Sequence, residues 1–140
     1  MCTLIVALGI DPLRPLIVGA NRDEQRGRPA EGPAPRRLGG VPCFAPLDVE
    51  RGGTWMGLGT EGLFVALTNR FGGAFPERRS RGEIVVAALA QEKVKAARSW
   101  AEALRGPDER GFHLVVADRE GGFVVVADGT SIRIESLLPG

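Results

Sequence analysis

The chain has 140 residues, of which 44% are hydrophobic and 25% charged, and its formal net charge is +1. This length predicts one domain, over residues 1–140, that can bury a core. A net charge so close to zero gives no reason to expect broad attraction to nucleic acid or to a membrane surface. The 20 glycines and 10 prolines predict many turns, as in a β-rich chain.

The two cysteines, Cys2 and Cys43, are too few for a disulfide scaffold, and their spacing matches no zinc site. We therefore expect a reducing compartment and no bound metal. Gly57 and Gly59 form no dinucleotide fingerprint, because no helix is predicted after them, and no cofactor is expected. The amino terminus lacks the features of a signal peptide, and no apolar run reaches the length of a membrane helix. These features predict a cytoplasmic protein without membrane insertion.

The first half of the chain predicts short antiparallel strands. Residues 3–8 and 16–20 are short apolar runs separated by a proline-rich turn, which predicts a hairpin. This hairpin brings Asn21–Glu24, which follow its second strand, close to Cys2. Residues 25–40 have no periodicity and predict an irregular loop or lid. Further strands are expected over 42–46 and 63–68, the second ending at Asn69 and Arg70.

The second half predicts a loop, two helices and a final group of strands. After the loop over 71–79, Ser80 and Glu83 have the spacing of a capping box ahead of an apolar run. Two helices are expected between about 80 and 105, with a break near Glu92 and a stop at 106–108. Strands are expected over 112–117, 123–127 and 131–137. The order of strands, helices and strands predicts an α+β fold with helices packed on antiparallel sheet.

Cys2 is the first candidate for chemistry. If Met1 is removed, Cys2 carries both a thiol and a free α-amino group, which can serve as its own base, as in N-terminal-nucleophile hydrolases. Arg22 could lower the pKa of the thiol or bind a substrate carboxylate. Either Asp23 or Glu24 could orient the protonated amine.

Other residues could complete such a site. Asn69 is a suitable side-chain donor to an oxyanion. Trp55, Met56 and Arg70 are candidates for contacts with a small-molecule substrate, although Trp55 and Met56 suit a core better than a ligand pocket. His113 is expected to be a neutral strand histidine, and Cys43 a small buried hydrophobe. Considered without the other motifs, Asn21–Glu24 suits a solvated turn.

Six motifs together resemble the NRDE family, also called the transport and Golgi organisation protein 2 family, whose first name repeats Asn21–Glu24. In chain order they are Met1-Cys2-Thr3-Leu4, Gly19-Ala20-Asn21-Arg22-Asp23-Glu24, Gly52-Gly53-Thr54-Trp55-Met56-Gly57, Ala66-Leu67-Thr68-Asn69-Arg70, Ser80-Arg81-Gly82-Glu83 and Leu114-Val115-Val116-Ala117-Asp118. The resemblance runs over nearly the whole chain.

The resemblance implies a branch of the N-terminal-nucleophile hydrolases near the penicillin V acylases and bile-salt hydrolases. It implies a four-layer αββα sandwich, with Cys2 as the nucleophile after loss of Met1. It also implies an Arg and an Asp that assist the thiol and amine and fall within Arg22–Glu24. Family members are usually considerably longer, so we expect a short or incomplete version of the sandwich. In the acylases an oxyanion Asn and a further Arg lie in the later part of the chain.

Two functions from different classes follow. The first is a cysteine amidohydrolase that acts on a non-peptide C–N bond of an unidentified substrate. The second is a non-catalytic carrier or binding protein, because eukaryotic relatives are tied to lipid or haem handling and to Golgi and secretory organisation. A weaker expectation is that the chain is half of a sandwich and forms a homodimer through exposed strand edges.

Overall fold

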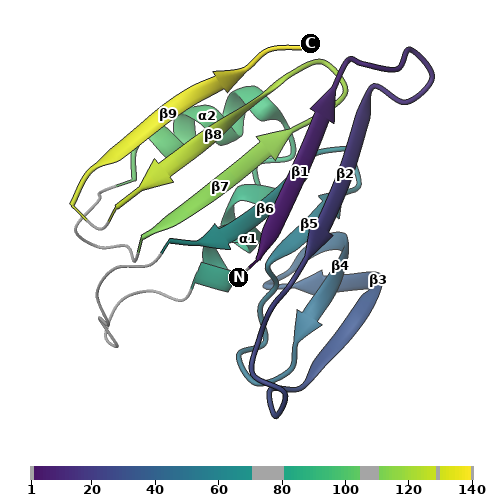
Figure 1. The fold of residues 1–140 in the computed structure, drawn as a ribbon, viewed down its shortest axis with the longest axis vertical. Helices are drawn as coiled ribbons and strands as arrows, with labels where there is room; N and C mark the ends of the chain where they lie inside the picture. Colours follow the sequence, from purple (N-terminus) through teal and green to yellow (C-terminus); the bar gives the residue numbers. More distant parts are fainter. Residues whose placement is uncertain (1, 71–80, 105–110, 129, 140) are drawn as a thin grey trace.

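The computed structural model describes residues 2–70, 81–104, 111–128 and 130–139. They form two antiparallel sheets and two helices, arranged with the helices behind a large sheet and a hairpin in front of it (Figure 1). The elements are β1 (Thr3–Leu8), β2 (Leu16–Asn21), β3 (Ala30–Leu38), β4 (Val41–Asp48), β5 (Met56–Gly59), β6 (Phe64–Asn69), α1 (Arg81–Leu89), α2 (Val94–Glu102), β7 (Phe112–Ala117), β8 (Gly122–Ala127) and β9 (Ile132–Leu137).

The large sheet has seven strands in the order of the sequence, from β3 at one edge to β9 at the other, and every neighbouring pair is antiparallel. Both helices lie between β6 and β7 in the chain and pack on one face, α1 against β5 and β6 and α2 against β7 and β8. The predicted α+β arrangement, with antiparallel sheets and two helices, is confirmed. The two helices are separated near Glu92, which has a positive φ of 61°.

The core lies between the helices and the large sheet. Every second residue of β7 and β8 points toward the helices, because side chains alternate between the two faces of a strand. Complete burial of one such side chain contributes about 1.5–3 kcal/mol to folding. The fully buried side chains include Phe112, Leu114, Val116, Phe123 and Val125 from the sheet and Ile84, Val85, Ala88 and Leu89 from α1.

Glycines allow α1 to approach the sheet closely. A Cβ added to Gly57 of β5 would lie 2.9 Å from Cδ1 of Leu89 and 3.3 Å from Cβ of Ala45. A Cβ on Gly53, in the loop before β5, would lie 3.2 Å from Cα of Gly82, so the two backbones touch there. The loop that carries Thr54 and Trp55 is therefore held directly against the first turn of α1.

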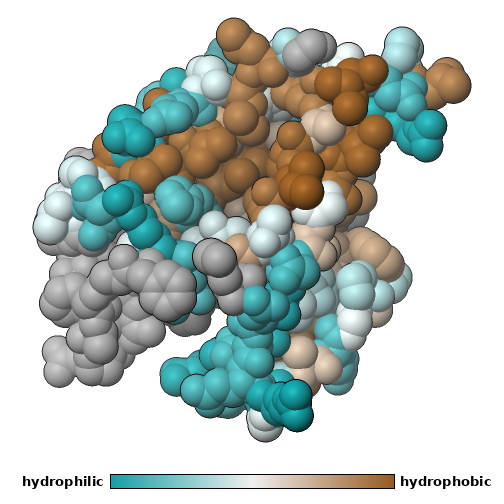
Figure 2. All heavy atoms as spheres, viewed as in Figure 1, coloured by the Kyte–Doolittle hydropathy of each residue, from teal (hydrophilic) through white to brown (hydrophobic). Residues whose placement is uncertain are grey.

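The β1–β2 hairpin covers the other face of the large sheet, over β6. Its inner row, formed by the cross-strand pairs Leu4–Ala20, Val6–Val18 and Leu8–Leu16, is less exposed than its outer row. Ile5 and Ile17 belong to the outer row and are exposed. Figure 2 shows apolar side chains gathered over this face, and hydrophilic ones toward the end where the chain leaves β2.

The expectation of an irregular loop over 25–40 is wrong for its second half. Residues 30–38 form β3, a nine-residue strand that contains Pro33 and Pro35. A proline cannot donate to a strand ladder, but it is tolerated at a sheet edge or beside a bulge. Both conditions hold, since β3 is the edge strand and its register shifts between Glu31 and Ala34.

Other element boundaries differ slightly from the expected ones. The strand expected over 42–46 extends over 41–48, so that Asp48 is its last residue. The second helix ends at Glu102, before the expected end at Arg105. The expected loop over 71–79, the capping residue Ser80 and the stop at 106–108 lie outside the described residues.

Replacement of Gly57 by Ala is expected to lower the free energy of unfolding by about 1–3 kcal/mol, because the new methyl group overpacks the contact with Leu89. Gly19→Ala is the matched control, since a Cβ on Gly19 meets nothing within 4 Å. Urea denaturation of both variants measures the difference. Equal stability of the two variants would contradict the close approach of α1 to β5.

Candidate functional site

Cys2 lies directly before β1, and the hairpin brings the end of β2 to it. Thr3 is paired with Asn21, and the backbone N–H of Thr3 donates to Oδ1 of Asn21 over 2.9 Å. The half-buried thiol of Cys2 donates to the backbone carbonyl of Asp23, with the sulfur 3.9 Å from the oxygen. The expected proximity of Cys2 to the residues after β2 is therefore confirmed.

Asp23, whose backbone carbonyl accepts from Cys2, is favoured in its ionised form. Its pKa is lowered first by a hydrogen bond from the chain's amino terminus and by the positive charge of that terminus. A smaller contribution comes from Nδ2 of Asn21, which donates to Oδ1 of Asp23 over 3.1 Å. This terminus is the amine of Met1, and which of the two acids orients the amine of Cys2 stays a prediction.

A narrow cleft separates the beginning of the hairpin from the large sheet. Its volume is about 20 Å³, which is room for about one water molecule. The cleft brings together the sequence-predicted residues Cys2, Asn21, Trp55 and Met56. The other lining residues are Thr3, Leu4 and Ala20 from the hairpin and Ala66, Leu67 and Thr68 from β6.

Arg22 follows Asn21 and is largely buried by its contacts. Its guanidinium carbon lies 4.3 Å from the centroid of the Trp55 ring, a cation–π arrangement that contributes about 0.5–2 kcal/mol. Its Nη2 also lies 3.3 Å from Oε2 of Glu24 and 3.4 Å from Oδ2 of Asp48. The predicted substrate residue Trp55 is therefore in contact with the predicted catalytic residue Arg22.

Asp48 and Arg28 belong to this cluster and were missed by sequence reasoning. Nη2 of Arg28 lies 2.6 Å from Oδ2 of Asp48, and Nη1 of Arg28 lies 3.2 Å from Oε2 of Glu24. Asp48 is 8% exposed and is one of two buried polar residues in the described part of the chain, the other being Thr54. The available signal was an acidic residue placed just ahead of the Gly52–Gly57 motif.

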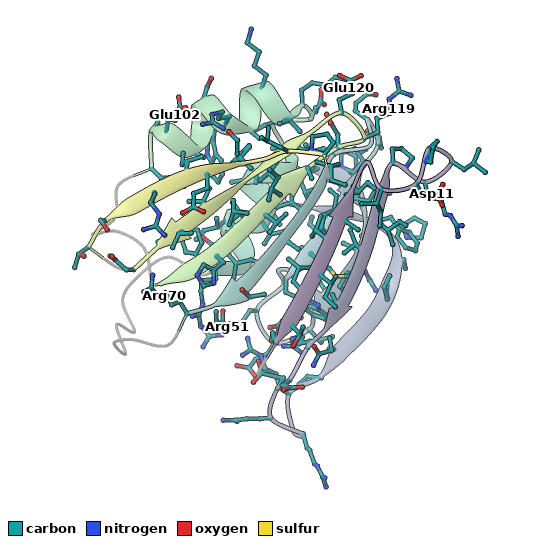
Figure 3. The ribbon with its side chains drawn as sticks, turned by 45° about the horizontal axis from the view of Figure 1, so that its top comes forward. Asp11, Arg51, Arg70, Glu102, Arg119 and Glu120 are labelled. Atoms are coloured by element: carbon teal, nitrogen blue, oxygen red, sulfur yellow. The ribbon has the colours of Figure 1, made fainter. Side chains whose placement is uncertain are left out.

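Asn69 and Arg70 lie at the end of β6 and are not among the residues that line the cleft. Asn69 is paired with Phe112, whose side chain is in the core on the helix side, and cross-strand partners share a face. Figure 3 shows Arg70 where β6 ends, away from the hairpin turn that carries Asp11. The roles of Asn69 in oxyanion binding and of Arg70 in substrate binding stay predictions.

The remaining candidates, Cys43 and His113, lie within strands of the large sheet. Cys43 is buried, and this burial raises the pKa of its thiol. His113 is half-buried on β7, opposite Thr68. Among the described residues, no group of three His, Cys, Asp or Glu side chains is placed to hold a metal ion. No helix in the same ranges is long and apolar enough to cross a membrane.

The family model described as "Transport and Golgi organisation 2" matches residues 1–136. The chain belongs to this family. It is 35% identical over 107 residues to the Transport and Golgi organization protein 2 homolog of Bos taurus, and 34% identical over 112 residues to that of Homo sapiens. Each match covers 74% of this chain and 38% of the relative. The matched region is thus less than two-fifths of the length of these relatives.

A solved structure has a fold similar to that of this chain. The chain is similar to penicillin V acylase from Agrobacterium tumefaciens, with a TM-score of 0.53 and 10% sequence identity. The match covers 98% of this chain and 50% of the acylase chain. The expected likeness of the fold to the penicillin V acylases is therefore confirmed for this member of the Transport and Golgi organisation 2 family.

In the chain that retains Met1, the Asp23 carboxyl is expected to titrate below its ordinary value of 3.8, and acetylation of the amino terminus should raise its pKa more than Asn21→Ala does. Because the native-state pKa is the lower one, Asp23 stabilises the fold above its ordinary pKa and loses this effect as the pH falls through the native value. Carboxyl-detected NMR titration measures the shift.

Asp128 is the internal control for this titration. Its pKa is lowered by hydrogen bonds from Thr130 and Ser131 in another turn, so neither change should alter it. An Asp23 pKa that is insensitive to acetylation would contradict the interaction of Asp23 with the amino terminus.

Proposed function

We propose that the protein is a cysteine amidohydrolase in which Cys2, after removal of Met1, attacks a non-peptide amide bond of a small-molecule substrate. The observation that carries this proposal is the position of Cys2 at the start of β1, in an acylase-like fold, within contact of the Asn21–Asp23 segment. A thiol, an amine and a carboxylate are the groups that N-terminal-nucleophile chemistry requires.

The proposed reaction has two steps. In the first, Sγ of Cys2 forms a bond to the acyl carbon and the C–N bond breaks. The thiol proton passes through the α-amine to the leaving nitrogen, which departs as an amine. In the second, water cleaves the thioester, so that the carboxylic acid leaves and the thiol is restored. The two steps together consume one water molecule and need no oxidant, reductant or cofactor.

Neighbouring side chains support these steps in defined ways. Asp23 holds the amine as it becomes protonated, as the third group of a triad does. Arg22 provides a positive charge that favours the thiolate. Asn21, which lines the cleft, is the side-chain amide proposed to assist the oxyanion, and Glu24 is paired with Arg22. Trp55, Met56 and Arg70 are proposed to contact the substrate.

The size of the cleft constrains where the substrate binds. A volume of about 20 Å³ is too small for an acyl group, but it suits the water that the second step needs. The acyl group therefore has to bind at the rim of the cleft, beside Cys2 and Trp55. The second candidate function is a carrier that binds its ligand on this face without cleaving it, and it is subject to the same restriction.

Cys2→Ala is expected to abolish hydrolysis of acyl amides, and Cys2→Ser to reduce it strongly, because a hydroxyl is the weaker nucleophile near neutral pH. Intact-mass analysis before the assay establishes that Met1 has been removed. Cys43→Ala is the matched control, since that thiol is buried and is not among the residues that line the cleft, and it should retain activity.

Two outcomes separate the candidates. Full hydrolysis by Cys2→Ala would eliminate the nucleophile mechanism. Ligand binding that persists in Cys2→Ala, without turnover in either protein and with Met1 retained, would favour the carrier.

A further inference from the structure

We infer that Asp48 is a positioning residue, whose buried carboxylate holds Arg22 over the Trp55 ring, at the end of the hairpin that carries Cys2. This inference rests on the proposed function for its catalytic meaning, but the arrangement itself can be tested without a substrate. Asp48 does not line the cleft. It acts through Arg22.

Asp48 is buried, and its carboxylate oxygens are paired with neighbouring arginines. An ionised carboxylate removed from water is costly unless it is paired and hydrogen-bonded. Oδ2 of Asp48 receives Arg28 at 2.6 Å and Arg22 at 3.4 Å, and Oδ1 receives Nε of Arg28 at 3.4 Å and the backbone N–H of Arg51 at 3.3 Å. Asp48 therefore holds its position through four contacts from three residues.

Chain topology makes Asp48 the meeting point of separate segments. Arg22 follows β2, Arg28 precedes β3, and Asp48 ends β4. These segments belong to the two different sheets, since β2 pairs with β1 and β3 with β4. The ion pair between Arg22 and Asp48 thus attaches the open end of the hairpin to the large sheet.

Asp48 also governs the position of the ring. Its backbone N–H donates to the carbonyl of Gly53 over 2.9 Å, and the N–H of Gly52 donates to its carbonyl over 2.8 Å. This closed loop leads directly to Thr54 and Trp55. One residue therefore places both partners of the cation–π contact, the guanidinium through its side chain and the indole through its backbone.

The register of the hairpin relates the position of Arg22 to that of the Cys2 thiol. Thr3 is paired with Asn21, so the next residues outward, Cys2 and Arg22, follow that pair at the open end of the hairpin. Arg22 can stabilise the thiolate only while its guanidinium is held at this end. If the Asp48 contact is lost, Glu24 and the ring remain as partners of Arg22, and both leave it more freedom.

The test uses Asp48→Asn in the full chain. Asparagine keeps the volume and the acceptor for the Arg51 N–H but loses the charge, so the loop is retained while the ion pair is weakened. Glu50→Gln is the matched control, because Glu50 is an exposed carboxylate that lies 4.0 Å from Arg28 and has no contact with Arg22. Urea denaturation establishes that both variants are folded.

Alkylation of Cys2 by iodoacetamide as a function of pH gives the first readout, with the modified peptide followed by mass spectrometry. Loss of a negative charge alone would favour the thiolate and speed alkylation near neutral pH. Displacement of Arg22 has the opposite effect. We expect Asp48→Asn to slow alkylation at pH 7 relative to the parent protein, and Glu50→Gln to leave it unchanged.

Fluorescence of Trp55 gives the second readout. The chain has two tryptophans, so Trp100→Phe makes Trp55 the sole reporter. In that background Asp48→Asn should change the emission and acrylamide quenching of Trp55 in the same direction as Arg22→Ala. Asp48→Glu, which keeps the charge but moves the carboxylate, serves if Asp48→Asn does not fold, and should give a smaller change of the same sign.

The outcomes decide the inference independently of the proposed function. Unchanged Trp55 fluorescence in Asp48→Asn, with a change in Arg22→Ala, would overturn it, and so would faster alkylation. An unresponsive Trp55 in Arg22→Ala would show that the stack is absent in solution and would also overturn it. Failure of the proposed function appears separately, as absence of hydrolysis by the parent protein. Where the parent does hydrolyse an amide, kcat should fall by about 10²-fold in Asp48→Asn with little change in KM.

Discussion

The register of the β1–β2 hairpin decides where the polar groups of the candidate site lie. Leu4, Val6 and Leu8 face the large sheet, and a shift of one residue would turn this whole row toward solvent. The correct register places Asn21 opposite Thr3, from which the contacts to Cys2 and Asp23 follow. An apolar row with no part in the proposed chemistry therefore fixes the position of Cys2, the proposed nucleophile.

A second constraint acts from the helix side of the large sheet. The backbone of Gly53 touches that of Gly82, and α1 is held close to β5 by Gly57. These contacts fix the loop that begins at Asp48 and ends at Trp55. The indole ring that meets Arg22 is thus placed by packing on the face opposite the hairpin. The candidate site lies between the hairpin and the large sheet. Its geometry nevertheless depends also on the packing of α1 against the other face of that sheet.

Local patterns in the sequence were sufficient to predict much of this structure. The β1–β2 hairpin, the two helices and strands β7 to β9 have apolar periodicity and turn residues that agree with their final state. The strand β3 was not predicted, because Pro33 and Pro35 argue against a strand unless its place at the sheet edge is known. That place depends on pairing with β4, which no local pattern reveals.

Site residues that meet through local pairing could be predicted from the sequence, whereas those that meet through long-range pairing could not. Asn21–Glu24 follow a strand whose hairpin partner begins beside Cys2, so a local pairing was enough to bring them together. Asp48 meets Arg22 and Arg28, which precede it by 26 and 20 residues, through the junction of two sheets. Its role becomes visible only when both sheets are in place, and its neighbours in the sequence resemble those of any acidic turn.

The composition of the ion cluster explains why position matters so much in it. Arg22 and Arg28 are balanced by Glu24 and Asp48, so the cluster as a set carries no net charge. The field that such a set exerts on a nearby thiol depends on which charge lies closest. Burial of Asp48 keeps solvent ions from screening this difference effectively. The reactivity of Cys2 should therefore follow the orientation of Arg22 rather than the number of arginines around it, which makes the residue that orients Arg22 as important as Arg22 itself.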